Sequence, residues 1–293
     1  MSWFQSFCSD GLIITDGAWG TEFQKLGLGI GEPSDFWNLA RPGDVESVAR
    51  SYVEAGSRVI LTNTFRSNAV ALTSATSAGE IAELNRRGAE LSRRAAGSDV
   101  RVFGSMGPTG KLLATGEIDA GAVGDAFREQ AAALASGGVD ALLLETFSDL
   151  EEARLAVRAV KDLDLPIVVS FAFDSGKNKD RTMMGVKPEA AGAAMAEEGA
   201  SAVGANCGAG PEAFAEVCRR LKEASGLPVW IKPNAGLPTL EAGRPKYTMD
   251  PEAFATFLPA LAAAGASFLG GCCGTSPAYI QALLKASRSC ASS

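Results

Sequence analysis

The chain contains no histidine among its 293 residues. This absence excludes catalysis by an imidazole, including the Ser-His-Asp and Cys-His arrangements, and it also excludes histidine as a metal ligand. A metal ion bound by this chain must therefore be held by sulfur or oxygen. The sequence also lacks a run of basic residues, and its net charge is −7. These features argue against binding to nucleic acid or to an anionic membrane surface.

Signals for export and for membrane insertion are weak as well. Residues 1–5 lack the basic and apolar regions of a signal peptide. No charged residue occurs in the range 253–284, but prolines and glycines interrupt it, so a buried helix followed by a buried strand explains it better than a membrane span. The six cysteines have no regular spacing that would suggest a disulfide framework. We therefore expect a cytoplasmic protein.

What the sequence does contain is a series of short apolar runs, which recur at intervals of roughly 25 to 45 residues. Most are continuous rather than alternating, which is typical of parallel strands covered on both faces. Helical patterns lie between them, such as the apolar face of Val45, Val48, Ala49, Tyr52 and Val53. Alternation of eight strands with helices predicts a (β/α)₈ barrel, with a doubly wound open sheet as the alternative. The predicted strands are 11–15, 58–63, 100–105, 141–145, 167–171, 202–206, 229–232 and 267–271.

The organisation of the chain is predicted to be simple. No linker-like or low-complexity segment divides it, so we interpret residues 1–293 as one domain, with a core from about 11 to 286. The polar tail 287–293 is predicted to be disordered. The sequence is compatible with a homo-oligomer.

Three cysteines fall where predicted strands end among glycines: Cys207, Cys272 and Cys273. Adjacent cysteines form a strained disulfide with each other, but both thiolates can reach one metal ion. If the two strands are neighbours, all three sulfurs converge, and three protein ligands with one open position are the pattern of a catalytic zinc site. Packing is the simpler explanation for the other cysteines, which are Cys8, Cys218 and Cys290.

Other polar residues lie at the predicted carboxyl ends of strands, where barrels of this type carry their chemistry. Asp16 and Glu145 could each cap a helix, but beside a thiolate-rich metal site they make better sense as acceptors for a substrate ammonium group. A substrate carboxylate could face the backbone amides of Gly17 and Ala18 and the side chains of Asn63 and Thr64.

A lysine and several aromatic residues near strand ends have two interpretations each. Lys232 occupies the place of a Schiff-base lysine in an aldolase-like barrel, although a structural role is favoured because Pro233 follows it and no partner is evident. Aromatic residues are more often core than ligand-binding, yet a cationic methyl donor would need an aromatic surface. The aromatic residues close to strand ends are Trp19, Phe36, Trp37, Phe65 and Phe147.

Six motifs at these strand ends together resemble the homocysteine S-methyltransferase family. This family includes betaine–homocysteine methyltransferases, S-methylmethionine-dependent enzymes and the homocysteine module of cobalamin-dependent methionine synthase. The resemblance extends from about residue 11 to 286, and the paired cysteine motifs are its most specific part. The motifs are DGAWGT (16–21), TNTF (62–65), GSMGPTG (104–110), ET (145–146), GANCG (204–208) and GGCCGT (270–275).

The resemblance implies a zinc-bearing (β/α)₈ barrel in which Cys207, Cys272 and Cys273 are the ligands. It also implies that Asp16 and Glu145 hold the amino group of homocysteine. The predicted substrate-binding set is completed by Gly17, Ala18, Asn63, Thr64 and Asn206.

The resemblance also bears on the methyl donor. Residues 35–38 and 181–186 look most like bacterial betaine–homocysteine enzymes, which implies glycine betaine as donor and dimethylglycine as the second product. Animal betaine enzymes carry tyrosines in the loops after the second and fourth strands, where this chain departs from them with Arg66 and Thr146. The candidates for the donor side are Trp19, Phe36, Trp37, Phe65, Arg66 and Thr146.

The predicted chemistry needs no imidazole. A thiol with a pKa near 8.5 is mostly protonated at neutral pH, whereas a metal-bound thiol is deprotonated. The substrate thiolate then displaces a methyl group from an onium donor. Alternative donors are S-methylmethionine, dimethylsulfoniopropionate, S-adenosylmethionine and a separate corrinoid protein. Alternatives from other classes are a phosphate-handling barrel lyase that uses Lys232 and a non-catalytic zinc- or thiol-binding protein.

Overall fold

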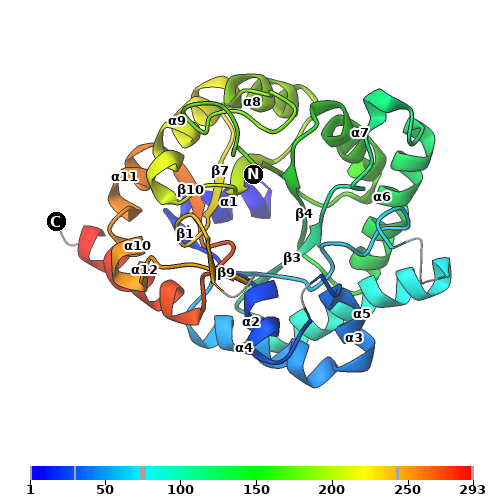
Figure 1. The fold of residues 1–293 in the computed structure, drawn as a ribbon, viewed down its shortest axis with the longest axis horizontal. Coiled ribbons are helices and arrows are strands. Elements are labelled where there is room, and N and C mark those ends of the chain that lie inside the picture. The colour runs from blue at the N-terminus through cyan, green and yellow to red at the C-terminus, as the bar shows by residue number, and fades with distance from the viewer. Residues whose placement is uncertain (1, 30, 73–76, 242–243, 292–293) are drawn as a thin grey trace.

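Eight parallel strands form a closed ring in the computed structural model (Figure 1). The structure describes residues 1–293 except 1, 30, 73–76, 242–243 and 292–293. The strands follow the order β1-β10-β7-β6-β5-β4-β3-β2, and a parallel bridge between Thr15 and Val59 joins the two ends. The amide of Arg58 donates to the carbonyl of Ile14 across the same seam, at 2.8 Å. The predicted (β/α)₈ barrel is therefore confirmed, and the open-sheet alternative is wrong.

Each parallel strand overlaps one of the eight predicted runs, with boundaries that differ by a few residues. The first two strands are shorter than predicted because their neighbours pair over only a few positions. The strands are β1 (Ile13–Ile14), β2 (Val59–Leu61), β3 (Arg101–Met106), β4 (Ala141–Phe147), β5 (Ile167–Phe171), β6 (Ala202–Cys207), β7 (Val229–Pro233) and β10 (Ala266–Leu269).

Helices cover the outside of the ring (Figure 1). The predicted face of α4 is confirmed at Val45, Val48, Ala49 and Tyr52, which are buried against the strands. Within the described residues, four short 3-10 helices accompany the α-helices: η1 (Ser34–Phe36), η2 (Leu113–Thr115), η3 (Lys161–Leu163) and η4 (Pro211–Ala213). The α-helices are α1 (Trp3–Ser9), α2 (Gly20–Lys25), α3 (Trp37–Ala40), α4 (Pro42–Glu54), α5 (Ala78–Ala96), α6 (Ala120–Ser136), α7 (Leu150–Val160), α8 (Pro188–Glu197), α9 (Phe214–Ser225), α10 (Pro251–Ala255), α11 (Leu258–Ala263) and α12 (Pro277–Ala291).

The amino-terminal end of the barrel is filled by aromatic rings. Helix α1, whose first turn is closed by a capping box between Ser2 and Gln5, places Phe4 inside the ring. Its ring centroid lies 5.9 Å from that of Phe268 and 6.3 Å from that of Phe103. Sequence reasoning placed the start of the core near residue 11, but Phe4 is only 3% exposed and belongs to the core.

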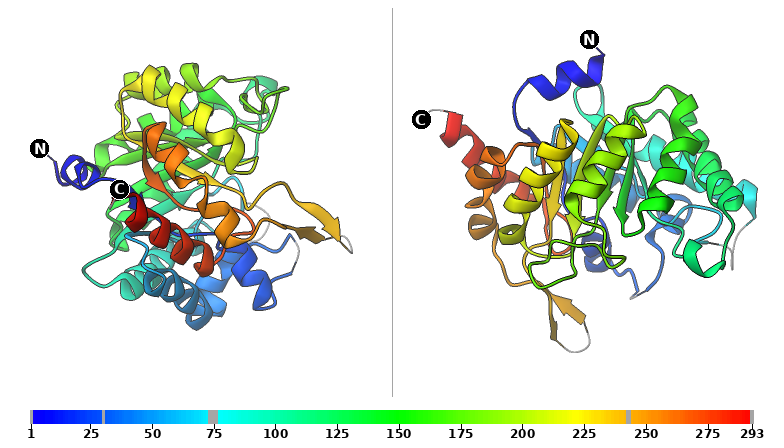
Figure 2. Two further views of the ribbon diagram at one scale, coloured as in Figure 1. Left: turned by 90° about the vertical axis from the view of Figure 1, so that its left-hand side faces the viewer. Right: turned by 90° about the horizontal axis from the view of Figure 1, so that it is seen from above.

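Two further segments differ from the sequence-based expectation. An antiparallel hairpin, β8 (Thr239–Glu241) with β9 (Arg244–Lys246), was not predicted. It follows β7 and projects from the carboxyl end of the barrel, whereas α1 lies at the opposite end (Figure 2). The tail expected from residue 287 is helical as far as Ala291, because α12 continues through it; residues 292 and 293 lie outside the described residues.

Among the described residues, no helix is both long enough and apolar enough to cross a bilayer.

Candidate functional site

The inner face of the barrel changes from apolar to polar over two residues. Side chains of a strand alternate between faces, so Ser105 follows Phe103 on the inner face of β3, and Lys232 follows Trp230 on that of β7. Glu145 follows Leu143 in the same way on β4. Phe103, Leu143 and Trp230 belong to the apolar interior cluster. The polar layer therefore lies at the carboxyl end of the strands, where barrel chemistry is expected.

A cavity of about 310 Å³ opens at this end. Its walls come from the ends of β2, β3, β4, β6 and β7 and from the loops that follow β1, β2 and β10. Eleven of the predicted site residues line it, namely Gly17, Ala18, Trp19, Asn63, Thr64, Phe65, Glu145, Thr146, Cys207, Cys272 and Cys273. The other eight lining residues had been given no role in binding the metal, homocysteine or the methyl donor: Gly20, Thr21, Ser34, Leu61, Thr62, Ser105, Lys232 and Gly271.

The three predicted metal ligands converge on this cavity. Cys207 comes from the end of β6, and Cys272 and Cys273 come from the loop after β10. The sulfur of Cys273 lies 3.9 Å from that of Cys207 and 4.0 Å from that of Cys272, and all three lie within 4.8 Å of one another. A tetrahedral zinc ion with Zn–S bonds of about 2.3 Å requires sulfur atoms about 3.8 Å apart. The donor set and its spacing therefore fit a metal ion held by three thiolates.

The electrostatics of the cysteines separate this cluster from the other cysteines. Hydrogen bonds from Cys272 and Cys273 lower the pKa of the Cys207 thiol, whereas hydrogen bonds to Cys207 and burial raise the pKa of Cys272 and raise that of Cys273 to about 12. The cluster itself therefore favours one negative charge, on the Cys207 sulfur. In contrast, burial raises the pKa of Cys8 to about 11 and that of Cys218 to about 12. Isolated thiols in apolar surroundings are inert, as the sequence-based interpretation of these two residues expected.

The backbone near the cysteines adopts conformations that need support. Cys207 has a φ of 61° and Thr146 a φ of 66°, values that are uncommon for residues other than glycine and that recur at functional sites. Asn206 supports Thr146, because its Oδ1 accepts from the Thr146 amide at 3.0 Å and its Nδ2 donates to the Thr146 hydroxyl at 2.7 Å. Gly270 is required before the cysteines, because a Cβ atom there would lie 2.1 Å from Thr15 Oγ1.

Asp16 lies below the cavity rather than on its wall. Its side chain is fully buried, and it is not among the residues that line the cavity. Its Oδ2 accepts from Trp19 Nε1 at 2.7 Å and from the Leu61 amide at 2.8 Å. Its Oδ1 forms an ion pair with Lys232 Nζ. The sequence gave no indication of this pair, because 215 intervening residues separate its members in the chain.

Glu145 does line the cavity. Its Oε1 accepts a hydrogen bond from the Ser105 hydroxyl, and the residue is 8% exposed. Burial raises the pKa of the Glu145 carboxyl, while the Lys232 ammonium and the Ser105 hydroxyl act in the opposite direction. A ligand ammonium beside this carboxyl would favour its charged form. Glu145 is therefore suited to bind a cationic group.

Several predicted residues lie near the cavity without facing it. Asn206 contacts Ser170 and Thr146 and does not line the cavity. Trp37 is buried, with its ring 5.4 Å from that of Phe23 and stacked by Arg41. Phe36 and Arg66 also lie outside the cavity wall.

Two hydrogen-bond partners of the site were missed by sequence reasoning. Ser34 donates its hydroxyl to Asn63 Oδ1 at 2.8 Å, and so positions a residue that was predicted. Tyr247, just after the hairpin, would overlap a Cβ atom at Gly274, and burial and the nearby Cys273 raise its pKa. Ser34 and Tyr247 lie far in the chain from the motifs they contact, so only the fold reveals them.

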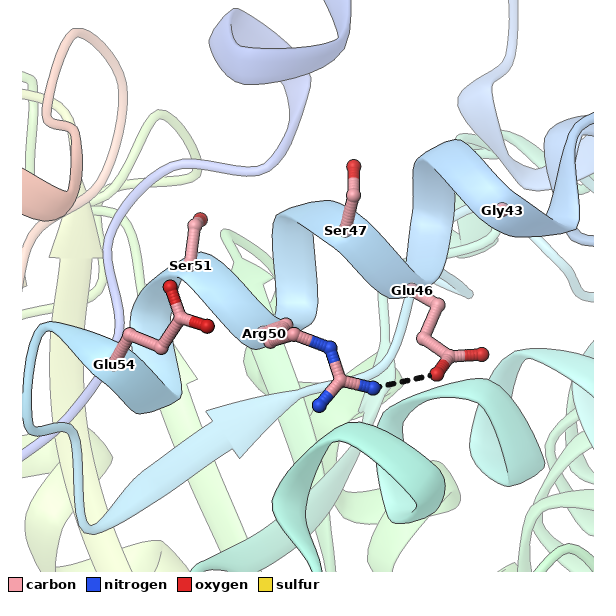
Figure 3. Close-up of a pocket in the computed structure, with 6 residues that line it drawn as sticks. All are labelled: Gly43, Glu46, Ser47, Arg50, Ser51 and Glu54. Carbon is pink, nitrogen blue, oxygen red and sulfur yellow. Dashed lines mark hydrogen bonds and ion pairs between the residues drawn. The ribbon is translucent and has the colours of Figure 1, made fainter.

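A second hollow lies on the outer surface of α4 (Figure 3). One helix supplies all of its lining, and its polar groups already interact, as in the ion pair between Arg50 and Glu46 at 2.8 Å. Figure 3 shows the other side chains spread along the exposed face without converging. This hollow contains none of the predicted site residues and presents no arrangement suited to chemistry.

Comparisons with known proteins agree with this geometry. The family model described as Homocysteine S-methyltransferase matches residues 13–287. Methionine synthase of Mycobacterium tuberculosis is 36% identical over 290 residues, which are 93% of this chain and 24% of that protein. Methionine synthase of Mycobacterium leprae is 34% identical over 296 residues, again 24% of that protein. The chain thus spans about a quarter of the length of these relatives.

Solved structures support the fold. The homocysteine methyltransferase MmuM from Escherichia coli, in its metallated form, is similar with a TM-score of 0.77 at 24% identity, covering 93% of this chain and 95% of that one. Its oxidized form gives a TM-score of 0.78 at 23% identity, covering 94% and 95%. At this identity the likeness concerns the barrel itself.

Proposed function

We propose, from the premise that the chain belongs to the homocysteine S-methyltransferase family, that it methylates the thiolate of homocysteine. The proposed donor is glycine betaine, and the products are methionine and dimethylglycine. The observation that carries this proposal is the convergence of three cysteine sulfurs on a cavity that also contains a buried carboxyl group. Thiolate ligands suit the activation of a further thiol, and the carboxyl group suits its amino group.

The metal proposed for the cluster is zinc. Its ligands would be Cys207, Cys272 and Cys273, whose spacing fits a tetrahedral site. When bound, it would hold the acceptor thiol deprotonated near neutral pH. The three cysteine thiolates would keep the site rich in negative charge, so the thiolate of the acceptor would remain nucleophilic.

The residues of the chain contribute binding and orientation. Glu145 receives the ammonium group of homocysteine, which places its thiol toward the cysteines. The acceptor sulfur then forms a bond to the methyl carbon as the bond between that carbon and the donor nitrogen breaks, and the electron pair of the broken bond stays on nitrogen. The amine departs neutral, so no general acid is required, in keeping with a chain without histidine. Alignment of donor and acceptor supplies much of the rate.

The donor side of the cavity is proposed to be the wall formed by Trp19, Phe65 and Thr146. Phe65 is 37% exposed, so its ring is accessible at the mouth. Aromatic faces attract quaternary ammonium and sulfonium groups, which suits betaine and also the sulfonium alternatives. The betaine assignment is further supported by the resemblance of residues 35–38 and 181–186 to bacterial betaine enzymes.

A donor panel tests the proposal. Zinc-replete protein is incubated with homocysteine and, separately, with glycine betaine, dimethylsulfoniopropionate, S-methylmethionine, S-adenosylmethionine or methylcobalamin, and methionine is quantified. We expect methionine from betaine. Turnover with a sulfonium or corrinoid donor alone would replace the donor while retaining the acceptor. Absence of methionine with every donor, from protein that contains zinc, would contradict the proposal.

A second experiment on the same protein tests the alternative function, a Schiff-base lyase. A Schiff-base lyase would need Lys232 as a free amine, whereas its Nζ forms an ion pair with buried Asp16. Borohydride reduction in the presence of small aldehydes and keto acids should therefore leave the mass of the protein unchanged. A stable adduct at Lys232 would favour the lyase.

A further inference from the structure

The cavity presents a lysine where sequence reasoning expected an aspartate. Lys232 lines the cavity and Asp16 does not. Both oxygens of Asp16 already have partners, because Oδ2 accepts from Trp19 and Leu61 and Oδ1 pairs with Lys232. A ligand ammonium would have to compete with Lys232 for this carboxylate. Asp16 is thus placed to hold Lys232 rather than the ligand.

The ammonium group of Lys232 retains donor capacity toward the cavity. It has three N–H groups, and one hydrogen bond, to Asp16, is found for it within the described part of the chain. On the side away from the cavity it faces the ring of Trp230, with 5.7 Å between Nζ and the ring centroid. Lys232 is the only lysine or arginine among the residues that line this cavity. It is therefore the positive group available to an anionic part of a ligand.

Three of the four groups that sequence reasoning proposed as donors to a carboxylate, all except the Gly17 amide, already donate to partners within the protein. The Ala18 amide donates to Thr275 Oγ1 at 3.1 Å. The side-chain amide of Asn63 donates to Ser34 O at 2.8 Å and to Asn38 Oδ1 at 3.0 Å. The Thr64 hydroxyl donates to the Ser105 carbonyl at 2.7 Å. A carboxylate entering the cavity would find these groups engaged by the protein.

We propose that Lys232 binds the α-carboxylate of the acceptor amino acid while Glu145 binds its ammonium group, with Asp16 as the positioning residue for Lys232. This inference rests on the proposed function, since it concerns how a thiol-bearing amino acid is recognised. The cavity then carries a cation and a carboxyl group that match the two charges of a zwitterion. Simple thiols would lack both contacts, which makes the pair a determinant of acceptor specificity.

Binding of three thiols tests the inference without knowledge of the methyl donor. Homocysteine carries both charged groups, 4-mercaptobutanoate lacks the ammonium, and 3-aminopropane-1-thiol lacks the carboxylate. Dissociation constants for zinc-replete protein are measured by titration calorimetry. Because a hydrogen bond to a charged group contributes roughly 10- to 100-fold in affinity, wild-type protein should bind homocysteine at least about 10-fold more tightly than 3-aminopropane-1-thiol.

The variant Lys232→Met should remove this preference. Its affinity for homocysteine and for 4-mercaptobutanoate should fall, while its affinity for 3-aminopropane-1-thiol stays within about twofold, because that ligand has no carboxylate to lose. Glu145→Gln is the matched control and should show the reverse pattern. A preference for homocysteine that persists in Lys232→Met would overturn the proposal, as would an equal loss for all three thiols.

Removal of Lys232 alone leaves a buried carboxylate without its partner, which is destabilising. The double variant Asp16→Asn/Lys232→Met removes both charges and should show the same selective loss if the single variant does not fold. A double variant that still prefers homocysteine over 3-aminopropane-1-thiol would reject the assignment. Failure of the proposed function is detected separately by the donor panel, in which no methionine would form with any donor. That result does not depend on the affinities for the three thiols.

Discussion

The two ends of the barrel interior use the same strands for opposite purposes. At the amino-terminal end, Phe4, Phe103, Trp230 and Phe268 pack with ring centroids 5.2 to 6.3 Å apart. One inward-facing position further along β7, Trp230 gives way to Lys232. The pairing of β7 with β6 continues in register through both layers, so on this strand the side chains decide whether a layer stabilises the fold or contacts a ligand.

The difference teaches how the barrel can hold charged groups that are buried. A buried ion pair has a desolvation penalty that its attraction only partly offsets, and Glu145 carries a raised pKa because of burial. Burial of the aromatic rings contributes free energy of folding, which offsets the cost of burying charged groups in the adjacent layer. Substitutions at the carboxyl end should therefore change activity, while those at the amino end should change stability.

The largest effect is expected at the cysteines. Cys272→Ser removes one thiolate from the cluster and should abolish zinc retention and lower kcat/KM by more than about 100-fold, the upper range for groups that only support a metal ligand. Metal content and methionine formation are measured on the same preparation. The free energy of unfolding, compared between metal-free forms, should change little. Normal turnover with unchanged zinc content would falsify the role of the cluster.

The aromatic layer should give the reverse result. Phe103→Ala leaves a cavity between Phe4, Trp230 and Phe268 and should lower the free energy of unfolding by about 3–5 kcal/mol, as measured by urea denaturation. The KM for homocysteine of the protein that remains folded should be unchanged. If the alanine variant does not fold, Phe103→Leu should give a smaller loss of the same kind. A stability change below about 1 kcal/mol would contradict this account of the layer.

A phenylalanine at the mouth provides a matched contrast. Phe65 is 37% exposed, whereas Phe103 is fully buried. Phe65→Ala should weaken binding of a cationic donor by about 0.5–2 kcal/mol through loss of a cation–π contact, visible as a higher KM for betaine. Its cost in stability should be well below that of Phe103→Ala. An unchanged donor KM would place the donor against another part of the wall.

The smallest effect concerns a carboxyl group at the functional end that serves structure. Glu152 accepts from the amide and hydroxyl of Thr109 at 2.7 and 2.6 Å, and burial raises its pKa from the ordinary value of 4.5. The folded state thus binds the proton more tightly than the unfolded state, and stability falls as pH rises from about 4.5 through the folded pKa.

Glu152→Gln keeps an acceptor oxygen and removes this titration. Relative to wild type it should gain stability between pH 4.5 and pH 8, by about 1.4 kcal/mol for each unit by which the pKa is raised. Thermal unfolding of both proteins at pH 5 and pH 8 measures the difference. A wild-type advantage that grows with pH would mean that the ionised carboxylate is the stabilising form.

Much of the fold was predictable because parallel barrels have a simple pattern. The apolar runs revealed all eight strands of the barrel, and the cysteines at two strand ends revealed the cluster of three sulfur atoms, since few other arrangements explain three cysteines among glycines. Helix α7 shows the limit of local rules. A capping box between Ser148 and Glu151 satisfies the spacing rule, but Asp149 is the N-cap, and its side chain accepts from the Glu151 amide at 2.8 Å.

The remaining features depend on contacts between distant parts of the chain. Phe4 is buried because it packs into the amino-terminal end of the barrel, and local sequence patterns do not reveal that end. The hairpin of β8 and β9 is short and lies outside the core, so no apolar alternation marks it. The pairing of Asp16 with Lys232 requires β1 and β7 to lie close across β10, which sequence spacing cannot indicate.

The seam that closes the barrel has a consequence for local opening. Across it, β1 and β2 share the single bridge between Thr15 and Val59, and the Asp16 carboxylate takes the place of a backbone acceptor for the Leu61 amide. Amide hydrogen exchange should therefore be faster at Leu61 than in the fully paired strands β4 and β5. A ligand that binds Lys232 should also restrict the motion of Asp16, which accepts from the Leu61 amide. Exchange of the Leu61 amide proton should then slow when the acceptor binds, so this exchange rate reports acceptor binding.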